Sequence, residues 1–175
     1  MNILVSFPKS ASDWLRYSFE YIYLRPTADE NEKPVLKLKH MLTKIGKPYE
    51  IPVDGSKEPI FVKKHYVSGV KNTDKCIFSY RDYKEVVFSF MYAQVQQRNP
   101  NPNLTIEDFV KNNFNKLNPQ FRQWMNNYVA YYNHKGDKHI MDYDNLLKNP
   151  KDEINSLIEF LTYDEIDLKR KEEFF

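Results

Sequence analysis

Polar residues that could hold an anion lie just before the first helical pattern of this 175-residue chain. They are Lys9, Ser10 and Ser12, which follow the apolar run Ile3–Val5 and precede a helical pattern that begins near Asp13. Backbone N–H groups at the start of a helix have no partner within the helix, and the helix dipole is positive there, so such a start can hold a phosphate or a sulfate. The order of strand, loop and helix therefore predicts an anion site with Lys9 as its charge. The plainer alternative is a capped helix after an edge strand.

Two further groups suited to chemistry on an anion come at the ends of later apolar runs. His65 lies in the strand expected over residues 60–66, and Arg81 directly follows the strand expected over residues 75–80. A guanidinium group can bind phosphate through two parallel hydrogen bonds, and an imidazole near its ordinary pKa can accept a proton at neutral pH. If the strands are parallel, their carboxyl ends share one edge of the sheet, where α/β folds bind ligands. We therefore expect Lys9, His65 and Arg81 at one edge, although a histidine at a strand end can also be purely structural.

The elements that must position these residues follow from the alternation of apolar runs with helical periodicity. That alternation predicts an α/β fold, a three-layer parallel sheet of about four to five strands flanked by helices. The strands are expected over residues 2–7, 60–66, 75–80 and 138–143. Helices are expected over residues 13–24, near 35–45, from Arg81 on, over 121–132 and from Pro150 on, and Thr105 with Asp108 indicates a further capped helix start. A single domain over residues 1–175 is the simplest division of the chain.

The composition limits the classes of partner. Lys and Arg total 26 against 24 for Asp and Glu, a net charge of +2, which is too balanced for a chain that binds nucleic acid over its whole surface. The single cysteine, Cys76, cannot form an internal disulfide, and the sequence has neither a secretory signal nor a run of roughly 18 apolar residues that could span a membrane. No cluster has the spacing of metal ligands. We therefore expect a cytoplasmic protein without nucleic-acid, membrane or metal partners, and the oligomeric state, including a homo-oligomer, stays open.

Four short motifs follow one another along the chain. They are Pro-Lys-Ser-Ala-Ser-Asp-Trp-Leu at residues 8–15, Lys-Lys-His at 63–65, Arg-Asp-Tyr-Lys-Glu-Val-Val-Phe-Ser at 81–89, and Tyr-Asp-Asn-Leu-Leu-Lys-Asn-Pro at 143–150. In this order they resemble the motifs of sulfotransferases that use 3′-phosphoadenosine 5′-phosphosulfate (PAPS). That family has Pro-Lys-Ser-Gly with a later Trp-Leu, then Lys-Thr-His, then Arg-x-Pro-Lys-Asp leading to a serine, and then Tyr-Glu-Asp-Leu running into Asn-Pro or Asp-Pro.

The resemblance implies a sulfotransferase fold of the P-loop NTPase type and a reaction. The reaction would move a sulfuryl group from PAPS to a hydroxyl or amine of a small-molecule acceptor, without a metal, and leave adenosine 3′,5′-bisphosphate (PAP). The residues that the resemblance assigns to this co-substrate are Lys9, Ser10, Ala11, Ser12 and Asp13 at the 5′ end, Arg81 and Ser89 at the 3′-phosphate, and Tyr143 with Trp14 at the adenine. For Trp14, plain helix core is an equal alternative.

The resemblance also implies three catalytic roles. His65 would take the proton from the acceptor as general base. Lys9 would stabilise the bridging oxygen of the leaving phosphate, and Lys63 would stabilise the sulfuryl oxygens. These roles agree with what in-line transfer between two oxygens requires, because charge develops on the leaving group while the acceptor loses a proton.

The chain departs from the family pattern at two places. Ala11 stands at the loop glycine and Asp13 at a hydroxyl residue, and we expect Asp13 to cap the first helix and face solvent. The family's Arg-Lys-Gly-x-x-Gly segment, which folds over the 3′-phosphate, has no counterpart beyond Arg170-Lys171, which Glu172 follows. We therefore expect a compact member with a shortened lid, in which Lys169 and Arg170 take over part of that role.

Three other functions stay open at this stage. The departures at Ala11 and Asp13 are compatible with a protein that binds PAP or PAPS but has lost catalysis. A nucleotide or small-molecule kinase of related fold is disfavoured because the Gly-x-x-x-x-Gly-Lys-Ser/Thr pattern is absent. A nucleic-acid or partner-binding module would use the lysine-rich stretch 31–75 and the aromatic residues, most of which fall on helical core faces instead.

Overall fold

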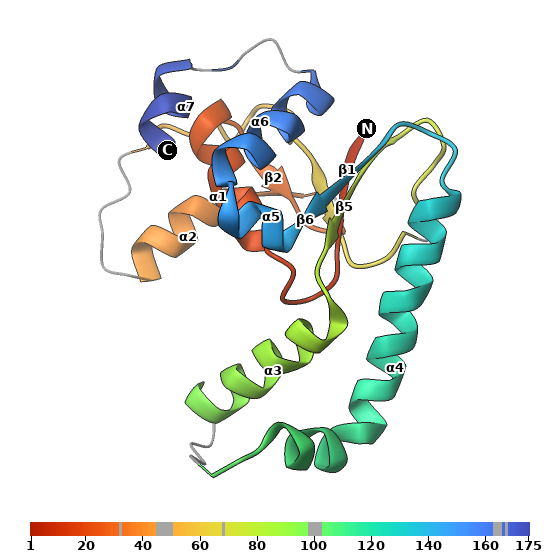
Figure 1. The fold of residues 1–175 in the computed structure, drawn as a ribbon. Coiled ribbons are helices and arrows are strands. Elements are labelled where there is room, and N and C mark those ends of the chain that lie inside the picture. Colours follow the sequence, from red (N-terminus) through yellow and green to blue (C-terminus); the bar gives the residue numbers. More distant parts are fainter. Residues whose placement is uncertain (32, 45–50, 68, 98–102, 163–165, 167) are drawn as a thin grey trace.

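The computed structural model describes residues 1–31, 33–44, 51–67, 69–97, 103–162, 166 and 168–175 (Figure 1). Within these residues six strands form one sheet in the order β3-β2-β4-β1-β5-β6. The strands are β1 Asn2–Ser6, β2 Thr27–Ala28, β3 Pro34–Val35, β4 Val62–Lys64, β5 Lys75–Tyr80 and β6 Lys138–Asp142. Neighbouring strands pair in parallel except β2 and β3, which are antiparallel. The α/β fold predicted from the sequence is confirmed, but the sheet has six described strands instead of four to five, and the pair β2 and β3 is antiparallel.

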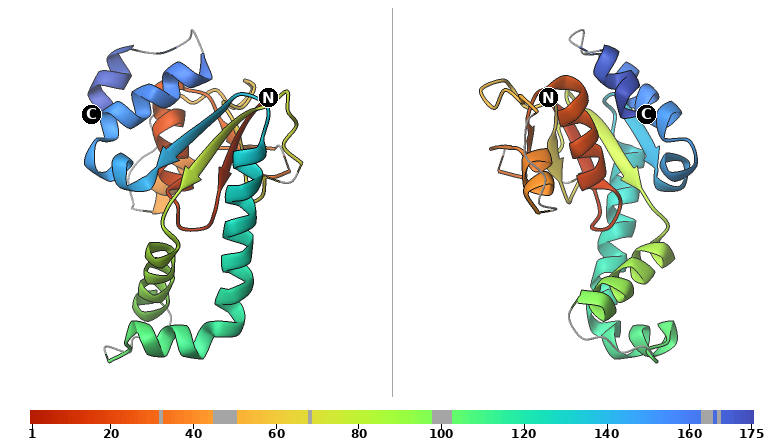
Figure 2. Two further views of the ribbon diagram at one scale, coloured as in Figure 1. Left: turned by 45° about the vertical axis from the view of Figure 1, so that its right-hand side comes forward. Right: turned by 90° about the vertical axis from the view of Figure 1, so that its left-hand side faces the viewer.

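Seven helices are described, and they cover both faces of the sheet. They are α1 Ser12–Tyr23, α2 Lys37–Lys44, α3 Tyr83–Gln97, α4 Ile106–Asn133, α5 Tyr143–Lys148, α6 Pro150–Leu161 and α7 Leu168–Phe174. Helices α1, α6 and α7 lie on one side of the sheet, and the upper part of α4 lies on the other (Figures 1 and 2). Among the described residues, none of the helices is both long enough and apolar enough to cross a bilayer.

The central strand β1 is buried on both faces. Leu4 packs in one apolar cluster with Leu15 of α1, whereas Ile3 packs in a second cluster with Tyr131 of α4. Cys76 of the neighbouring strand belongs to the second cluster, and burial raises the pKa of its thiol to about 12. Alternate residues of a parallel strand therefore face the two helical layers, as expected for a sheet covered on both sides.

Helix α3 and the first part of α4 form an arm that extends beyond the carboxyl ends of the strands (Figures 1 and 2). The predicted start at Thr105 is confirmed, because its side chain accepts a hydrogen bond from the N–H of Asp108. The helix expected over 121–132 is instead the second part of one 28-residue helix. Pro119 lies inside this helix, which changes direction along its length. Proline causes such a change because it has no backbone N–H to donate and its ring clashes with the carbonyl of the preceding turn.

A buried polar network ties α1 to the segment that carries β2 and α2. Glu20 is fully buried and accepts hydrogen bonds from Thr27 Oγ1 at 2.6 Å and from the N–H of Leu38 at 2.7 Å. Arg16 is also buried and donates to Thr27 Oγ1 at 2.7 Å and to Asp29 Oδ1 at 2.6 Å. Buried charges are costly unless they are paired and hydrogen-bonded. The network therefore fixes the path of the chain after α1.

Candidate functional site

The loop between β1 and α1 is held by main-chain contacts that leave its surface open. The N–H of Ser10 donates to Phe7 O at 3.2 Å, and Ser10 O accepts from the hydroxyl groups of Ser6 and of Ser79 at the end of β5. Lys9 is exposed and has a positive φ of 69°. Ser10 is fully buried, and its hydroxyl has no hydrogen-bond partner among the described residues. An orphaned buried hydroxyl beside a helix start is the kind of group that an anionic ligand can satisfy.

Arg81 lies against this loop and against Tyr143. Its Nη1 donates to Lys9 O at 2.8 Å, and its guanidinium carbon lies 4.0 Å from the centroid of the Tyr143 ring. Its Nη2 is 3.9 Å from Glu85 Oε2, and its Nε is buried without a partner in the described part of the chain. The main chain of Arg81 is fixed from α4, because Trp124 Nε1 donates to Arg81 O at 3.0 Å. The structure thus brings together three of the residues predicted from the motifs.

His65 follows β4 and turns its ring toward the end of β1. Its Nδ1 lies 3.1 Å from Ser6 O, and because a carbonyl oxygen can only accept, Nδ1 carries the proton and Nε2 carries the lone pair. Lys63 Nζ lies 3.2 Å from Nδ1 and donates to Nε2. Burial lowers the pKa of Lys63, and Glu30 and Asp29 offset part of that effect. A proton-accepting nitrogen and a cation therefore adjoin each other at the end of β4.

The main chain of His65 is held from two sides by residues that lie outside the predicted motifs. Its N–H donates to Glu30 Oε1 at 2.7 Å, and its carbonyl accepts from Asn127 Nδ2 at 2.6 Å. Asn127 is 4% exposed, and its Oδ1 accepts from the N–H of Val67 at 3.2 Å. Both contacts are to backbone and cross 35 and 62 positions of sequence, so no local pattern marks them. These two contacts fix the position of the His65 backbone from which the imidazole extends.

Comparison with known proteins agrees with this geometry. A family model described as the sulfotransferase domain matches residues 2–173. The chain belongs to the sulfotransferase family. Among curated proteins, sulfotransferase 1 family member D1 of Mus musculus is 26% identical over 178 residues, which cover 93% of this chain and 59% of that protein.

Two solved structures share the fold of this sulfotransferase chain. Mouse sulfotransferase SULT7A1 complexed with PAP has a TM-score of 0.63 at 21% identity, and the match covers 96% of this chain and 61% of that one. Retinol dehydratase, in complex with androsterone and the inactive cofactor PAP, has a TM-score of 0.56 at 14% identity, with 98% and 62% covered. The chain thus spans about three fifths of the length of these relatives. The expected sulfotransferase fold is confirmed.

The expectation that Asp13 caps the first helix of this sulfotransferase chain is wrong. The N-cap residue of α1 is Ala11, and no side chain caps the helix. Asp13 lies in the first turn and is exposed, as expected, where a carboxylate interacts favourably with the helix dipole. Ala11 has a φ of 64°, the left-handed region, at the position where the family motif has glycine. Ala11 therefore has a backbone conformation that glycine adopts more easily.

Ser12, Trp14 and Ser89, three other motif residues, lie in three different environments. Ser12 begins α1 and is half-buried. Trp14 packs against the apolar cluster that contains Leu15, which favours its structural alternative. Ser89 is half-buried on α3, and because Arg81, Glu85 and Ser89 are spaced by four residues, they share one side of the chain from the end of β5 into α3. No hydrogen bond within the described residues joins Ser89 to Arg81.

The suggestion that Lys169 and Arg170 replace part of the lid is wrong. Lys169 pairs with Glu173 at 3.7 Å, and the guanidinium of Arg170 lies 5.5 Å from the centroid of the Tyr21 ring on α1. Tyr21 is nine residues beyond the start of α1, or about 13 Å along the helix axis from the loop. Helix α7 therefore packs on the far half of α1, away from the candidate anion site.

Two of the other histidines, His134 and His139, have structural surroundings. His134 is buried and its Nε2 lies 3.3 Å from Asp74 O, and burial lowers the pKa of His139, which contacts Phe160. The side chain of His40 lies outside the described residues. Within the described ranges, no group of three or more His, Cys, Asp or Glu residues is placed to hold a metal ion.

Proposed function

We propose that this protein transfers a sulfuryl group from PAPS to a hydroxyl or amine of a small-molecule acceptor. The observation that carries the proposal is the gathering of the loop after β1, the Arg81 guanidinium and the His65 imidazole at the carboxyl ends of β1, β4 and β5. Membership of the sulfotransferase family and the mouse sulfotransferase structure complexed with PAP support it.

The residues present fit a nucleotide with phosphates at both ends. The open start of α1, the orphaned hydroxyl of Ser10 and the exposed Lys9 suit the 5′ end, together with the other loop residues. Arg81 and Ser89 suit the 3′-phosphate, and the stacked ring of Tyr143 suits the adenine. A cation on the loop and a second cation at the end of β5 suit a ligand that carries more than one phosphate group.

The chemistry follows from the placement of His65 and Lys63. The acceptor oxygen forms a bond to sulfur while the bond from sulfur to the bridging phosphate oxygen breaks, and its electron pair leaves on that oxygen as PAP. The acceptor proton passes to Nε2 of His65. Lys63 donates to the same nitrogen, so the acceptor must displace it, and Lys63 then neutralises the sulfuryl oxygens while Lys9 stabilises the leaving oxygen.

Thermal unfolding with PAP or with ATP and magnesium tests the binding part. We expect PAP to raise the midpoint and ATP to raise it less, because a ligand that binds only the folded state stabilises it. Arg81→Ala should weaken PAP binding by about 10- to 100-fold, since a charged hydrogen-bonding group is lost. Stabilisation by ATP with magnesium but not by PAP would contradict the proposal and favour a kinase.

Radiolabelled PAPS with a panel of alcohols, phenols and amines tests the chemical part. We expect His65→Ala to lower turnover by about 10²- to 10⁴-fold while PAP binding survives. His139→Ala, at the opposite end of the sheet, is the matched control and should leave turnover unchanged. Full turnover without His65 would remove it as the base.

PAP binding with no turnover on any acceptor would favour the second candidate, a PAP-binding protein without catalysis. The strained Ala11 and the occupied Nε2 lone pair point to this candidate.

A further inference from the structure

A cleft of about 660 Å³ lies between α4 and the segment that follows His65. We call it the amide cleft, because five of its lining side chains are carboxamides. Its polar lining residues are Tyr66, Asn72, Arg122, Gln123, Asn126, Asn127, Asn133 and His134. No carboxylate lines it, and its volume is within the usual range for small-molecule sites.

The amide cleft begins next to the proposed base. Tyr66 and Val67, which directly follow His65, form part of its wall. Asn127 lines the cleft and also donates to the carbonyl of His65 at 2.6 Å. The same buried side chain therefore shapes the cleft and holds the main chain of the base. The wall of the cleft therefore begins one residue after His65 along the chain.

The lining matches a ligand that is rich in hydroxyl groups. A carboxamide donates and accepts at once, and so does a hydroxyl, so the two pair without leaving either group unsatisfied. Within the part of the chain that the structure describes, the side chains of Gln123, Asn126 and Asn133 have no hydrogen-bond partner. Tyr66 is 50% exposed and offers a flat apolar face. The half-buried side chain of Gln123 and the exposed side chains of Asn126 and Asn133 offer donors and acceptors beside an aromatic ring, which suits a sugar better than an apolar phenol.

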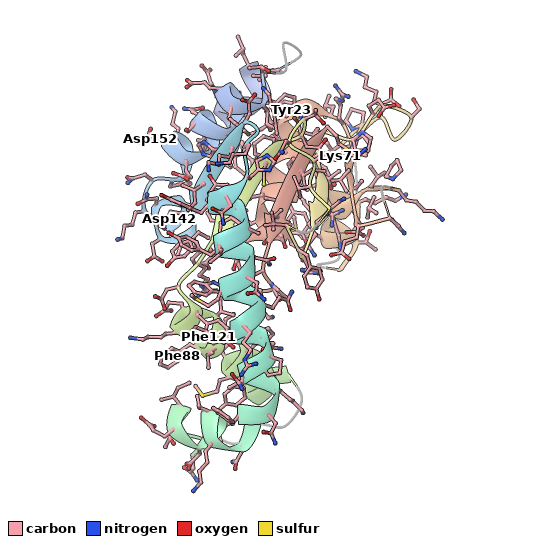
Figure 3. The ribbon with its side chains drawn as sticks, turned by 90° about the vertical axis from the view of Figure 1, so that its right-hand side faces the viewer. Tyr23, Lys71, Phe88, Phe121, Asp142 and Asp152 are labelled. Atoms are coloured by element: carbon pink, nitrogen blue, oxygen red, sulfur yellow. The ribbon has the colours of Figure 1, made fainter. Side chains whose placement is uncertain are left out.

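A second cavity provides the contrast. An apolar groove of about 410 Å³ lies between α3 and α4, lined by residues that include Val87, Phe88, Phe114 and Phe121. Figure 3 shows Phe88 and Phe121 to the left of α4 and Lys71, which lies between two residues of the amide cleft, to its right. His65 is joined by hydrogen bonding to the amide cleft and not to any described residue of the apolar groove. The two cavities therefore offer opposite chemistry, and only one adjoins the base.

We propose that the amide cleft holds the acceptor and that the acceptor is a neutral oligosaccharide or a similar polyhydroxylated molecule. This inference rests on the proposed sulfotransferase function. One hydroxyl reaches His65 past Tyr66 and is sulfated there, while the remaining hydroxyls bond to Gln123, Asn126 and Asn133.

The test offers labelled PAPS with two probes, a set of neutral glucose, galactose and N-acetylglucosamine oligosaccharides and the apolar phenol 2-naphthol. We expect label in an oligosaccharide, and Gln123→Ala and Asn126→Ala should each raise its KM by about 3- to 10-fold with kcat and PAP binding unchanged. Phe114→Ala, in the apolar groove, is the matched control and should change none of these values. The side-chain NH₂ resonances of Gln123 and Asn126 should also shift when the sugar is added.

The outcomes separate this inference from the proposed function. Sulfation of 2-naphthol with no label in any oligosaccharide would overturn the inference and leave sulfotransfer standing. The inference also fails if an oligosaccharide is sulfated with a KM that the Gln123 and Asn126 variants do not alter. A chain that PAP does not stabilise and that transfers no label would remove the proposed function, and the inference with it.

Discussion

At the scale of single residues, the loop after β1 holds a conformation that its sequence does not favour. A left-handed φ costs an L-residue about 1–2 kcal/mol, whereas glycine adopts it freely but loses more entropy on folding. Ala11, at φ 64°, has this conformation. We therefore expect Ala11→Gly to raise the free energy of unfolding by about 0.5–1 kcal/mol, measured by urea denaturation.

Ala93→Gly is the matched control because it makes the same chemical change inside α3. It should lower the free energy of unfolding by about 1 kcal/mol, the ordinary helix penalty for glycine. Destabilisation of equal size at both positions would mean that the loop does not strain Ala11.

Lys63 is a residue whose burial costs stability. Burial lowers its pKa below the ordinary 10.5, so between the two values the unfolded chain binds more protons and stability rises with pH. Below the lowered pKa the full cost of burying the charge is present. We expect Lys63→Met to be more stable than the unmodified chain near neutral pH, with the advantage shrinking as the pH approaches 10.5.

Urea denaturation at several alkaline pH values measures this difference. Lys169→Met, at an 86% exposed position, controls for the loss of a lysine and should change stability by less than about 0.5 kcal/mol. A difference for Lys63→Met that stays constant across the alkaline range would rule out burial of its charge as the cause. A lower free energy of unfolding because of Lys63 is consistent with a residue that is retained for the reaction.

At the scale of elements, the long periodic segments were predictable and the short ones were not. Strands β1, β4, β5 and β6 and helices α1, α3 and α6 follow from apolar runs and helical spacing, because those patterns persist over several residues. However, β4 covers only Val62–Lys64 of the strand expected over residues 60–66. β2 and β3 have two residues each and lie in a proline-rich stretch, so they carry no alternation. Tertiary pairing, not local preference, makes them strands.

The residues of the candidate site also divide into predictable and unpredictable ones. Lys9, His65 and Arg81 were predictable as neighbours because parallel strands bring their carboxyl ends to one edge. Glu30 and Asn127 were not, because they act on the backbone of His65 from distant segments. Such contacts depend on where β2 and α4 pack, which a single sequence does not encode locally.

Placement of β2 depends on the buried Glu20. Replacing it by alanine leaves the N–H groups of Thr27 and Leu38 without an acceptor in the core. We expect Glu20→Ala to lower the free energy of unfolding by about 2–4 kcal/mol, measured by urea denaturation. Glu173→Ala, which removes only an exposed ion pair on α7, should cost less than about 0.5 kcal/mol. Equal effects would show that the buried network adds nothing beyond surface pairing.

At the scale of the whole molecule, stability is distributed unevenly between the layered core and the arm. Among the described residues, the arm has a buried cluster of only three residues, Val87, Phe109 and Leu117, whereas the cluster beneath α1 and α6 contains fourteen. Local opening requires less free energy where little apolar surface is buried. The arm therefore depends on α4, whose upper part is anchored on the sheet by Tyr131.

This imbalance predicts a pattern of backbone hydrogen exchange, and PAP binding should alter that pattern only around the candidate anion site. Backbone amides of residues 106–117 should exchange faster than those of β1 and β5, and mass spectrometry of peptides can measure the difference. PAP should slow exchange over residues 7–15 and at the start of α3, because it would satisfy the open start of α1 and bind Arg81. It should leave residues 106–117 unchanged. Equal protection of the arm and the central strands would contradict the uneven core, and PAP-induced protection confined to residues 106–117 would place the nucleotide in the apolar groove rather than beside β1.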